Sequence, residues 1–191
     1  AAVGPRALAM TADLADGVML NAMSSNHAVR RIVSLLRERR AELGRPVAND
    51  WVVLKTASTV TTSDEETDRV LRRQRRVMAM INALPGMTSL IESPRWNIDE
   101  IMTTVRQRLK VDEHLQAGSG FPALRHEDLD HAAAAIPLDL VAEVSITGSI
   151  DYVHQRICEC RDLGVTHLSV ALPREASISA WQATLERLRQ P

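Results

Sequence analysis

The small residues that open the sequence are its first candidates for chemistry. The chain begins Ala1-Ala2-Val3-Gly4, and Pro5 then starts a run of helix-forming residues. Small residues before a helix leave backbone N–H groups uncovered, and these groups bind phosphate together with the positive end of the helix dipole. The Gly-Pro pair is also common in ordinary turns, so the residues by themselves favour a turn and leave a phosphate site as the alternative.

Polar side chains that follow expected strands are the second group of candidates. Enzymes built from alternating strands and helices keep their chemistry at the carboxyl ends of the strands. The residues that we expect at this substrate rim are Asn21, Ser24, Ser25, Thr59 and Arg174. Asn21 is equally suited to bonding its own turn backbone. The adjacent Glu175 is an alternative partner for the Arg174 guanidinium.

Other charged patterns have structural explanations. Lys55 lies inside an expected strand, where a lysine usually extends its ammonium group to solvent. His126 and His131 in "RHEDLDH" are five residues apart, which fits neither one helix face nor one strand face, so we expect a solvated acidic turn and no metal site. The basic run "RRQRR" at 72–76 follows the acidic "SDEETD", which indicates a hydrated helix face.

Hydrophobic spacing predicts the elements that position these residues. Short runs rich in Val, Leu and Thr indicate strands, and apolar residues three and four apart indicate helices. We expect strands at 17–21, 51–60 and 165–173. After a first helix over 5–15, we expect helices with apolar faces within 29–43, 70–81, 98–109, 150–163 and 178–188.

Capping residues and glycines mark the joints between these elements. Ser63 to Glu66 has the Ser-x-x-Glu form of a capping box, and Ser149 is placed to cap another helix. Gly17 and Gly164 each follow a helix and precede a strand, which is the helix-to-strand joint of a βαβ unit. Such units require parallel strands with right-handed crossovers, so the fold class is α/β.

The alternation of strands and helices breaks between Leu84 and Pro137. We interpret residues 84–137 as a mainly helical insertion before the last βα units. Three strands are too few for a closed fold, because a parallel sheet is covered on both faces and a (β/α)8 barrel needs eight strands. The residues therefore leave a small open sheet or the rear portion of a barrel as the alternatives.

Two segments carry a family resemblance. "AAVGPRALAMTADLADGVMLNAMS" and "VSITGSIDYVHQRICECRDLGVTHLSVALP" resemble, in order and separation, the C-terminal half of the bacterial luciferase-like family of flavin and deazaflavin oxidoreductases. The nearest likeness is to the branch similar to methylenetetrahydromethanopterin reductase. It spans nearly the whole chain, although the insertion carries little of it. The resemblance implies that residues 1–191 are the C-terminal portion of one luciferase-like TIM-barrel domain.

The same resemblance implies a cofactor and its anchor. In the family the cofactor phosphate meets the backbone of the turn that corresponds here to Ala1, Ala2, Val3 and Gly4. The cofactor is then coenzyme F420, with FMN as the alternative. The loop "NAMSSN" lacks the lysine of the family's sugar-phosphate dehydrogenases, which counts against a sugar phosphate as substrate. The N-terminal half of the barrel is an expected partner that supplies ring contacts, so no catalytic residue is assigned.

Composition excludes several classes of function. The formal net charge of -1 provides no overall field for nucleic acid or an anionic membrane. Every apolar run is too short to span a bilayer, which needs about 20 residues. Cys158 and Cys160 point to different helix faces and cannot easily pair, so we expect a reducing, cytoplasmic location.

Two hypotheses of different classes follow. The first is an oxidoreductase that transfers hydride between F420 or FMN and a small organic substrate, because such cofactors carry the difficult step. Homo-oligomerisation is possible in either case. The second is a non-catalytic half-barrel that acts as a pairing subunit or interaction module, because an open barrel exposes its edge strands.

Overall fold

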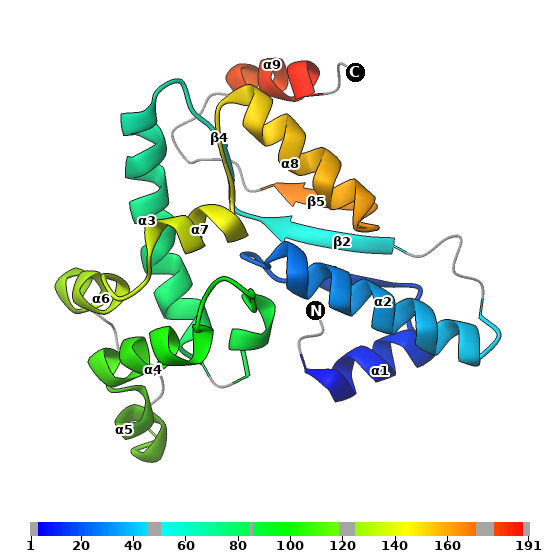
Figure 1. Cartoon of the computed structure of the whole chain (residues 1–191), viewed down its shortest axis with the longest axis horizontal. Coiled ribbons are helices and arrows are strands. Elements are labelled where there is room, and N and C mark those ends of the chain that lie inside the picture. Colours follow the sequence, from blue (N-terminus) through cyan, green and yellow to red (C-terminus); the bar gives the residue numbers. More distant parts are fainter. Residues whose placement is uncertain (1–3, 46–50, 85, 119–124, 171–177, 189–191) are drawn as a thin grey trace.

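The main sheet consists of three parallel strands in the spatial order β1-β2-β5 (Figure 1). The computed structural model describes residues 4–45, 51–84, 86–118, 125–170 and 178–188. The strands are β1 (Gly17–Leu20), β2 (Trp51–Thr56) and β5 (His167–Val170). Since β1 and β5 each pair only with β2 among the described residues, both are edge strands.

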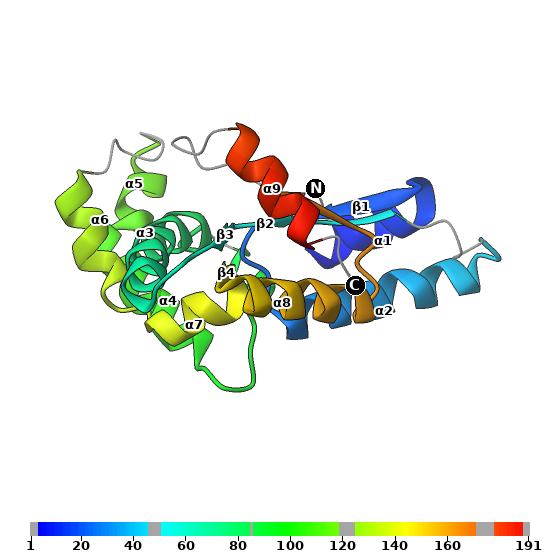
Figure 2. The same ribbon diagram turned by 90° about the horizontal axis from the view of Figure 1, so that it is seen from above.

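Helices cover one face of this sheet. Helices α2 and α8 lie along the same side of it in Figure 2. Alternate strand residues, including Leu20 and Leu54, are buried in one core with residues of the helices. The helices that contribute are α1 (Pro5–Leu14), α2 (Asn26–Glu42) and α8 (Ile150–Asp162).

The opposite face of the sheet is largely exposed. We call it the bare face and define it by Met19, Trp51, Val53, Lys55, His167 and Ser169. The exposed fractions of Met19 and Trp51 are 46% and 60%. The indole of Trp51 stacks on the His167 ring with centroids 4.9 Å apart. Parallel sheets in α/β proteins are usually covered on both faces, so the exposure of this face departs from that arrangement.

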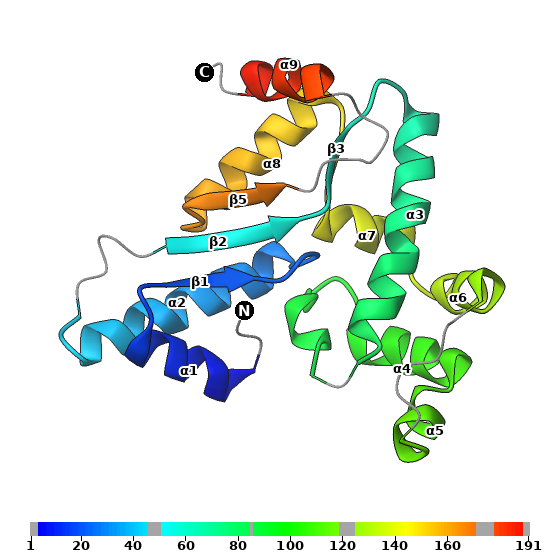
Figure 3. The same cartoon turned by 180° about the vertical axis from the view of Figure 1, so that it is seen from behind.

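The expected strand 51–60 divides at Ala57 between two sheets. Strand β2 ends at Thr56, and β3 (Ser58–Val60) then pairs in parallel with β4 (Ile146–Gly148). Figure 3 shows β2 running into β3 without an intervening loop. The sequence did not predict this division or β4, because three-residue strands have no periodicity long enough to detect.

A cluster of helices stands beyond the carboxyl ends of the strands (Figure 1). Its apolar residues form a second core, in which Met78, Met102 and Leu140 are buried. A short 3-10 helix, η1 (Thr88–Leu90), links it to the sheet. The helices are α3 (Asp64–Asn82), α4 (Ile98–Leu109), α5 (Val111–Gln116), α6 (His126–Ala133) and α7 (Leu138–Val144). Helix α9 (Ile178–Leu188) lies near α8, and residues of both helices line one cavity.

The predicted helix caps are present. The Ser63 hydroxyl accepts a hydrogen bond from the Glu66 N–H, and the Ser149 hydroxyl accepts one from Tyr152. Gly164 adopts φ +93° at the end of α8, as its place before a strand predicts. The Glu66 carboxylate bonds the N–H of Thr62, one residue before the partner that a capping box would give it.

Three predicted details are wrong. The apolar faces expected within 29–43 and 70–81 included Leu43 and Val77, but these residues are 44% and 38% exposed. Helix α2 ends at Glu42, and Val77 faces away from the second core. Residues 126–131 belong to helix α6 rather than a solvated turn. Arg125 is the N-cap residue of this helix, and its guanidinium donates two hydrogen bonds to the Asp128 carboxylate in the first turn. This ion pair favours a helix start at His126.

Candidate functional site

The amino end of α1 has no side-chain cap among the described residues. Gly4 is the N-cap residue of α1, and Pro5 occupies its first turn. A side chain at Gly4 would meet no atom within 4 Å. The first turn carries no acidic residue. An uncapped helix start with free space around it fits a phosphate group, since the unpaired N–H groups and the helix dipole attract negative charge.

Four of the residues predicted for the site lie outside the described residues. These are Ala1, Ala2 and Val3 of the proposed phosphate turn, and Arg174. Their contact with a ligand stays a prediction. Gly4 is the part of the phosphate turn that the structure describes, and its extended backbone, with φ −87° and ψ 161°, is open to most residue types.

The loop after β1 uses its polar groups largely for its own structure. The Asn21 side-chain oxygen accepts a hydrogen bond of 2.9 Å from the Ala22 N–H, and the Ser24 hydroxyl donates one of 2.9 Å to the Asn21 carbonyl oxygen. Ser25 is fully buried; its hydroxyl caps α2 through the Ala28 N–H and also donates to the Glu92 carbonyl oxygen. The hydroxyls of Ser24 and Ser25 are thus engaged within the protein, whereas the Asn21 amide NH2 makes no hydrogen bond with the described residues.

Met23 gives this loop an uncommon backbone. It has φ +60°, a left-handed conformation that is unfavourable for residues other than glycine. Its side chain is buried in the core of the helical cluster. Conversely, Leu90 of η1, which belongs to the helical region, is buried in the core beneath the sheet. The Leu90 carbonyl oxygen accepts a hydrogen bond of 2.9 Å from the Ser25 N–H. The two segments therefore interlock, and this packing offsets the backbone strain of Met23.

Thr59 lies in β3, opposite Thr147 of β4. It lines an apolar cavity of about 180 Å³ with Thr56, Ile157, Trp181 and Leu185, between the second sheet and helices α8 and α9. This cavity is separate from the bare face, because Thr56 points to the side of the sheet opposite Lys55. The structure thus separates Thr59 from the loop that holds Asn21.

Two polar residues of the bare face, Lys55 and Ser169, were not among the predicted site residues, and they lie near Asn21, which was. Lys55 pairs in register with Ser169, and Leu54 pairs with Leu20, so Asn21 follows at the level of Lys55. Lys55 and Ser169 lie in the neighbouring strands β2 and β5, and Asn21 is the first residue after β1, at the end of the sheet toward which the strands run. The sequence signal was the alternation of exposed and buried residues in β2, but the register that aligns the strands is a tertiary property.

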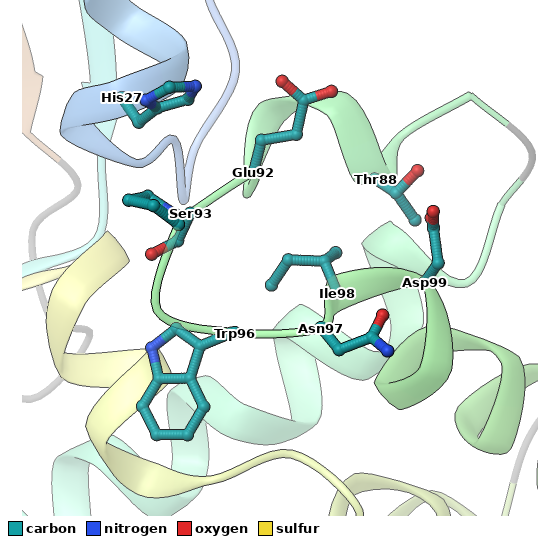
Figure 4. Close-up of a pocket in the computed structure, with 9 residues that line it drawn as sticks. His27, Thr88, Glu92, Ser93, Trp96, Asn97, Ile98 and Asp99 are labelled. Atoms are coloured by element: carbon teal, nitrogen blue, oxygen red, sulfur yellow. The ribbon is translucent and has the colours of Figure 1, made fainter.

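A further cavity lies away from these groups. It has a volume of about 370 Å³ and lies between the start of α2, η1 and the start of α4. Figure 4 shows His27, Glu92, Trp96 and Asp99 around it. Glu92 pairs with Arg31 at 3.3 Å. The carboxylates of Glu92 and Asp99 in this cavity disfavour a phosphate ligand. None of the predicted site residues lines the cavity.

Ionisable groups with shifted pKa values lie outside the candidate site. Burial is the main cause that raises the pKa of the Cys160 thiol in α8. The pKa of Glu66 is lowered by its hydrogen bonds from Thr62. Within the described ranges, no three His, Cys, Asp or Glu side chains gather closely enough to hold a metal ion. The helices in those ranges are also too short or too polar to cross a membrane.

A family model described as luciferase-like monooxygenase matches residues 1–167. This range contains the uncapped start of α1, strands β1 to β4 and the first residue of β5. No significant relative was found among proteins of curated function.

Solved structures share the fold at low sequence identity. The coenzyme F420-dependent tetrahydromethanopterin reductase from Methanopyrus kandleri is 21% identical with a TM-score of 0.60, and the match covers 98% of this chain and 48% of the reductase. An F420-dependent secondary alcohol dehydrogenase is 11% identical with a TM-score of 0.58, covering 98% and 47%. EDTA monooxygenase from Chelativorans sp. BNC1 is 14% identical with a TM-score of 0.50, covering 97% and 43%. The chain therefore spans about half the length of these structures.

Proposed function

Because the chain belongs to the luciferase-like monooxygenase family, we propose that it forms part of an oxidoreductase that uses a bound deazaflavin or flavin. The fold is a partial luciferase-like barrel with its inner surface exposed. In this proposal the protein transfers hydride between the cofactor and a small organic substrate. The observation that carries the proposal is the uncapped, unobstructed start of α1 on a family barrel.

The residues of this chain would hold the cofactor by its phosphate. In the part of the chain that the structure describes, the N–H groups of the first turn of α1 have no side-chain acceptor, which favours their contact with phosphate oxygens. Ala1, Ala2 and Val3 would add backbone contacts, and Asn21 and Arg174 would border the substrate. The bound cofactor supplies the hydride chemistry, while the protein positions the ring and excludes water.

Coenzyme F420 is our preferred cofactor, and FMN is the alternative. Two of the solved structures that share the fold are F420-dependent enzymes by name, and the third is a monooxygenase. An uncapped helix start recognises a phosphate and does not distinguish the two cofactors, since both carry one. Direct comparison of F420 and FMN binding by the same preparation decides between them.

The remaining half of the barrel is the partner that we propose for the bare face. The solved structures are about twice as long as the matched region. Strands β1 and β5 both have an unpaired edge among the described residues, as a sheet opened at two points would have. Further βα units that pair with both edges would close a ring and bury Met19 and Trp51.

Substitution of Gly4 separates a phosphate anchor from a simple helix start. In Gly4→Asp, the new carboxylate can cap α1, so a purely structural role predicts unchanged or slightly higher stability and unchanged cofactor binding. The proposed anchor predicts that the same carboxylate repels phosphate and weakens cofactor binding by about tenfold or more. Gly4→Asn is the matched control, because it caps the helix without the charge.

The measurement is cofactor affinity in the protein as its gene encodes it. Visible absorbance and fluorescence titration with F420 and with FMN give the two dissociation constants for each variant. Equal affinity of Gly4→Asp and Gly4→Asn would contradict the phosphate anchor.

The second candidate function is a non-catalytic half-barrel that pairs with another protein. The exposed aromatic and aliphatic residues of the bare face favour it, because large exposed apolar patches mark interaction sites. Gel filtration with an absorbance scan discriminates the two functions. Colourless protein that takes up neither cofactor, in a preparation that contains a complete barrel, would support the pairing subunit.

A further inference from the structure

The polar row consists of Lys55 and Ser169 of the bare face and of Asn21, the residue that follows β1. Lys55 and Ser169 are direct partners in the register of β2 and β5, and Asn21 follows Leu20, whose partner Leu54 precedes Lys55. The row below it, toward the amino ends of the strands, is Met19, Val53 and His167. The bare face therefore changes from mainly apolar to hydrogen-bonding at the ends of the strands where ligands of such barrels bind.

The three side chains of this row offer chiefly hydrogen-bond donors. The Lys55 ammonium has three N–H donors and no acceptor. The Asn21 side-chain oxygen is already occupied by the Ala22 N–H, which leaves its NH2 group to donate. The Ser169 hydroxyl adds a further donor. Such a set matches an acceptor that carries negative charge, because hydrogen bonds to ionised oxygens are the strongest.

The position of Lys55 also demands an anionic partner. It is the single charged residue in β1, β2 and β5, and it makes no ion pair with any residue in the described ranges. When the rest of the barrel covers the bare face, the ammonium loses water, and an unpaired buried charge is strongly unfavourable. A lysine is thus tolerated at this place if an anion meets it.

We propose that Lys55, Asn21 and Ser169 form a binding site for an anionic oxygen group of the substrate, namely a carboxylate or an oxygen that gains negative charge during hydride transfer. This inference rests on the proposed function, because it takes the bare face as the inside of the barrel. It assigns the substrate class as an acid or a carbonyl compound. Lys55 holds the charged oxygen, and Asn21 and Ser169 orient it.

The scarcity of lysine in the chain makes the site directly testable. Two of the 23 basic residues are lysines, Lys55 and Lys110. Lys110 lies exposed between α4 and α5 and serves as the internal reference. Acylation by sulfosuccinimidyl acetate, followed by peptide mass spectrometry, gives the relative rate at each lysine in the protein as its gene encodes it. We expect Lys55 to react about tenfold more slowly than Lys110.

Acetate and the neutral acetamide are the ligand probes. We expect acetate to slow the acylation of Lys55 further, acetamide to leave it unchanged, and neither to affect Lys110. In calorimetric titration, Lys55→Met weakens acetate binding by about 10- to 100-fold, which is the range for a charge-assisted hydrogen bond. Lys110→Met is the matched control and keeps the affinity of the unsubstituted protein.

Three results would overturn the proposal in different ways. Equal acylation of the two lysines would show that Lys55 lies in solvent. Protection of Lys55 that acetate does not change, with a lower Tm of ligand-free Lys55→Met, would identify a carboxylate of the protein itself as the partner. Acetate affinity that Lys55→Met leaves unchanged would place the anion elsewhere. Protection by acetate in a protein that binds neither F420 nor FMN would instead contradict the proposed function and support this site.

Discussion

The sheet region and the helical cluster differ in how completely they bury their hydrophobic side chains. In the cluster, Met78, Met102 and Leu140 from three helices are enclosed in one core. In the sheet region, Leu20 and Leu54 are enclosed on one face, whereas Met19 and Trp51 remain exposed on the other. The comparison shows that the helical cluster, together with Met23 from the loop after β1, encloses its apolar side chains, whereas the sheet encloses them on one face only.

Methionine substitutions in the two regions test this difference most strongly. Met102 is fully buried in the cluster, so Met102→Ala is expected to lower the free energy of unfolding by about 2–5 kcal/mol. Met19→Ala removes the same atoms from the bare face and is expected to cost within about 0.5 kcal/mol in residues 1–191. Urea unfolding of both variants is the measurement. A large cost at Met19 would mean that the bare face is covered in this chain, for example by a second copy.

The pairing of β1 with β2 is expected to be sensitive to an added side chain at Gly17, although this residue lies beside the exposed Trp51. A Cβ atom at Gly17 would lie 2.6 Å from the Trp51 Cβ atom and would also meet the Trp51 carbonyl oxygen. Gly17→Ala therefore forces the two strands apart, at a cost of about 1–3 kcal/mol. Thermal unfolding measures it, and Gly4→Ala, which meets no atom, is the control. A neutral Gly17→Ala would contradict the described register.

Helix caps give smaller effects that differ between the two regions. Ser63→Ala removes the cap of α3 and is expected to cost about 1 kcal/mol. Ser25→Ala removes the cap of α2 and leaves the Glu92 carbonyl oxygen without this donor in a buried place, so its cost is expected to be larger, up to about 2–3 kcal/mol. Equal costs in urea unfolding would show that the bond from Ser25 to Glu92 adds nothing.

The smallest expected effect is a pH dependence at the start of α3. Hydrogen bonds from Thr62 lower the pKa of Glu66 below its ordinary value of 4.5. A carboxylate whose pKa is lower in the folded than in the unfolded state stabilises the protein at pH values above its unfolded-state pKa. This contribution is lost as the pH falls through the folded-state pKa. Glu66→Gln is therefore expected to flatten the stability profile between about pH 5 and 3. Unfolding measured across this interval, with Glu38→Gln on the exposed side of α2 for comparison, reports the difference.

Local signals in the sequence predicted most of the scaffold. The strands at Gly17 and His167, the stripe on α4 and the caps at Ser63 and Ser149 all follow from residue spacing and capping chemistry. The family resemblance supplied the incomplete barrel, which the family model and the shared fold confirm. The rim functions of Asn21, Ser24 and Ser25 stay predictions.

The features that escaped prediction depend on contacts between distant segments. Arg156 looked like an ordinary helix residue, yet it is buried and donates to Asn26 and to the Glu143 carbonyl oxygen from two other parts of the chain. Met23 from the loop after β1 packs in the core of the helical cluster, and Leu90 of η1 packs in the core beneath the sheet. Neither arrangement leaves a local pattern, because each partner is more than 12 residues away in sequence.

The passage of β2 into β3 with only Ala57 between them limits how the two regions can move. Lys55 lies two residues before this joint, so the binding row and the helical cluster are attached to one continuous extended segment. Any hinge movement of one region relative to the other through this segment therefore has to be absorbed by the φ and ψ angles at Ala57 and its two neighbours. Substitutions at Ala57 that restrict its backbone would then act on both regions together, although Ala57 belongs to neither strand.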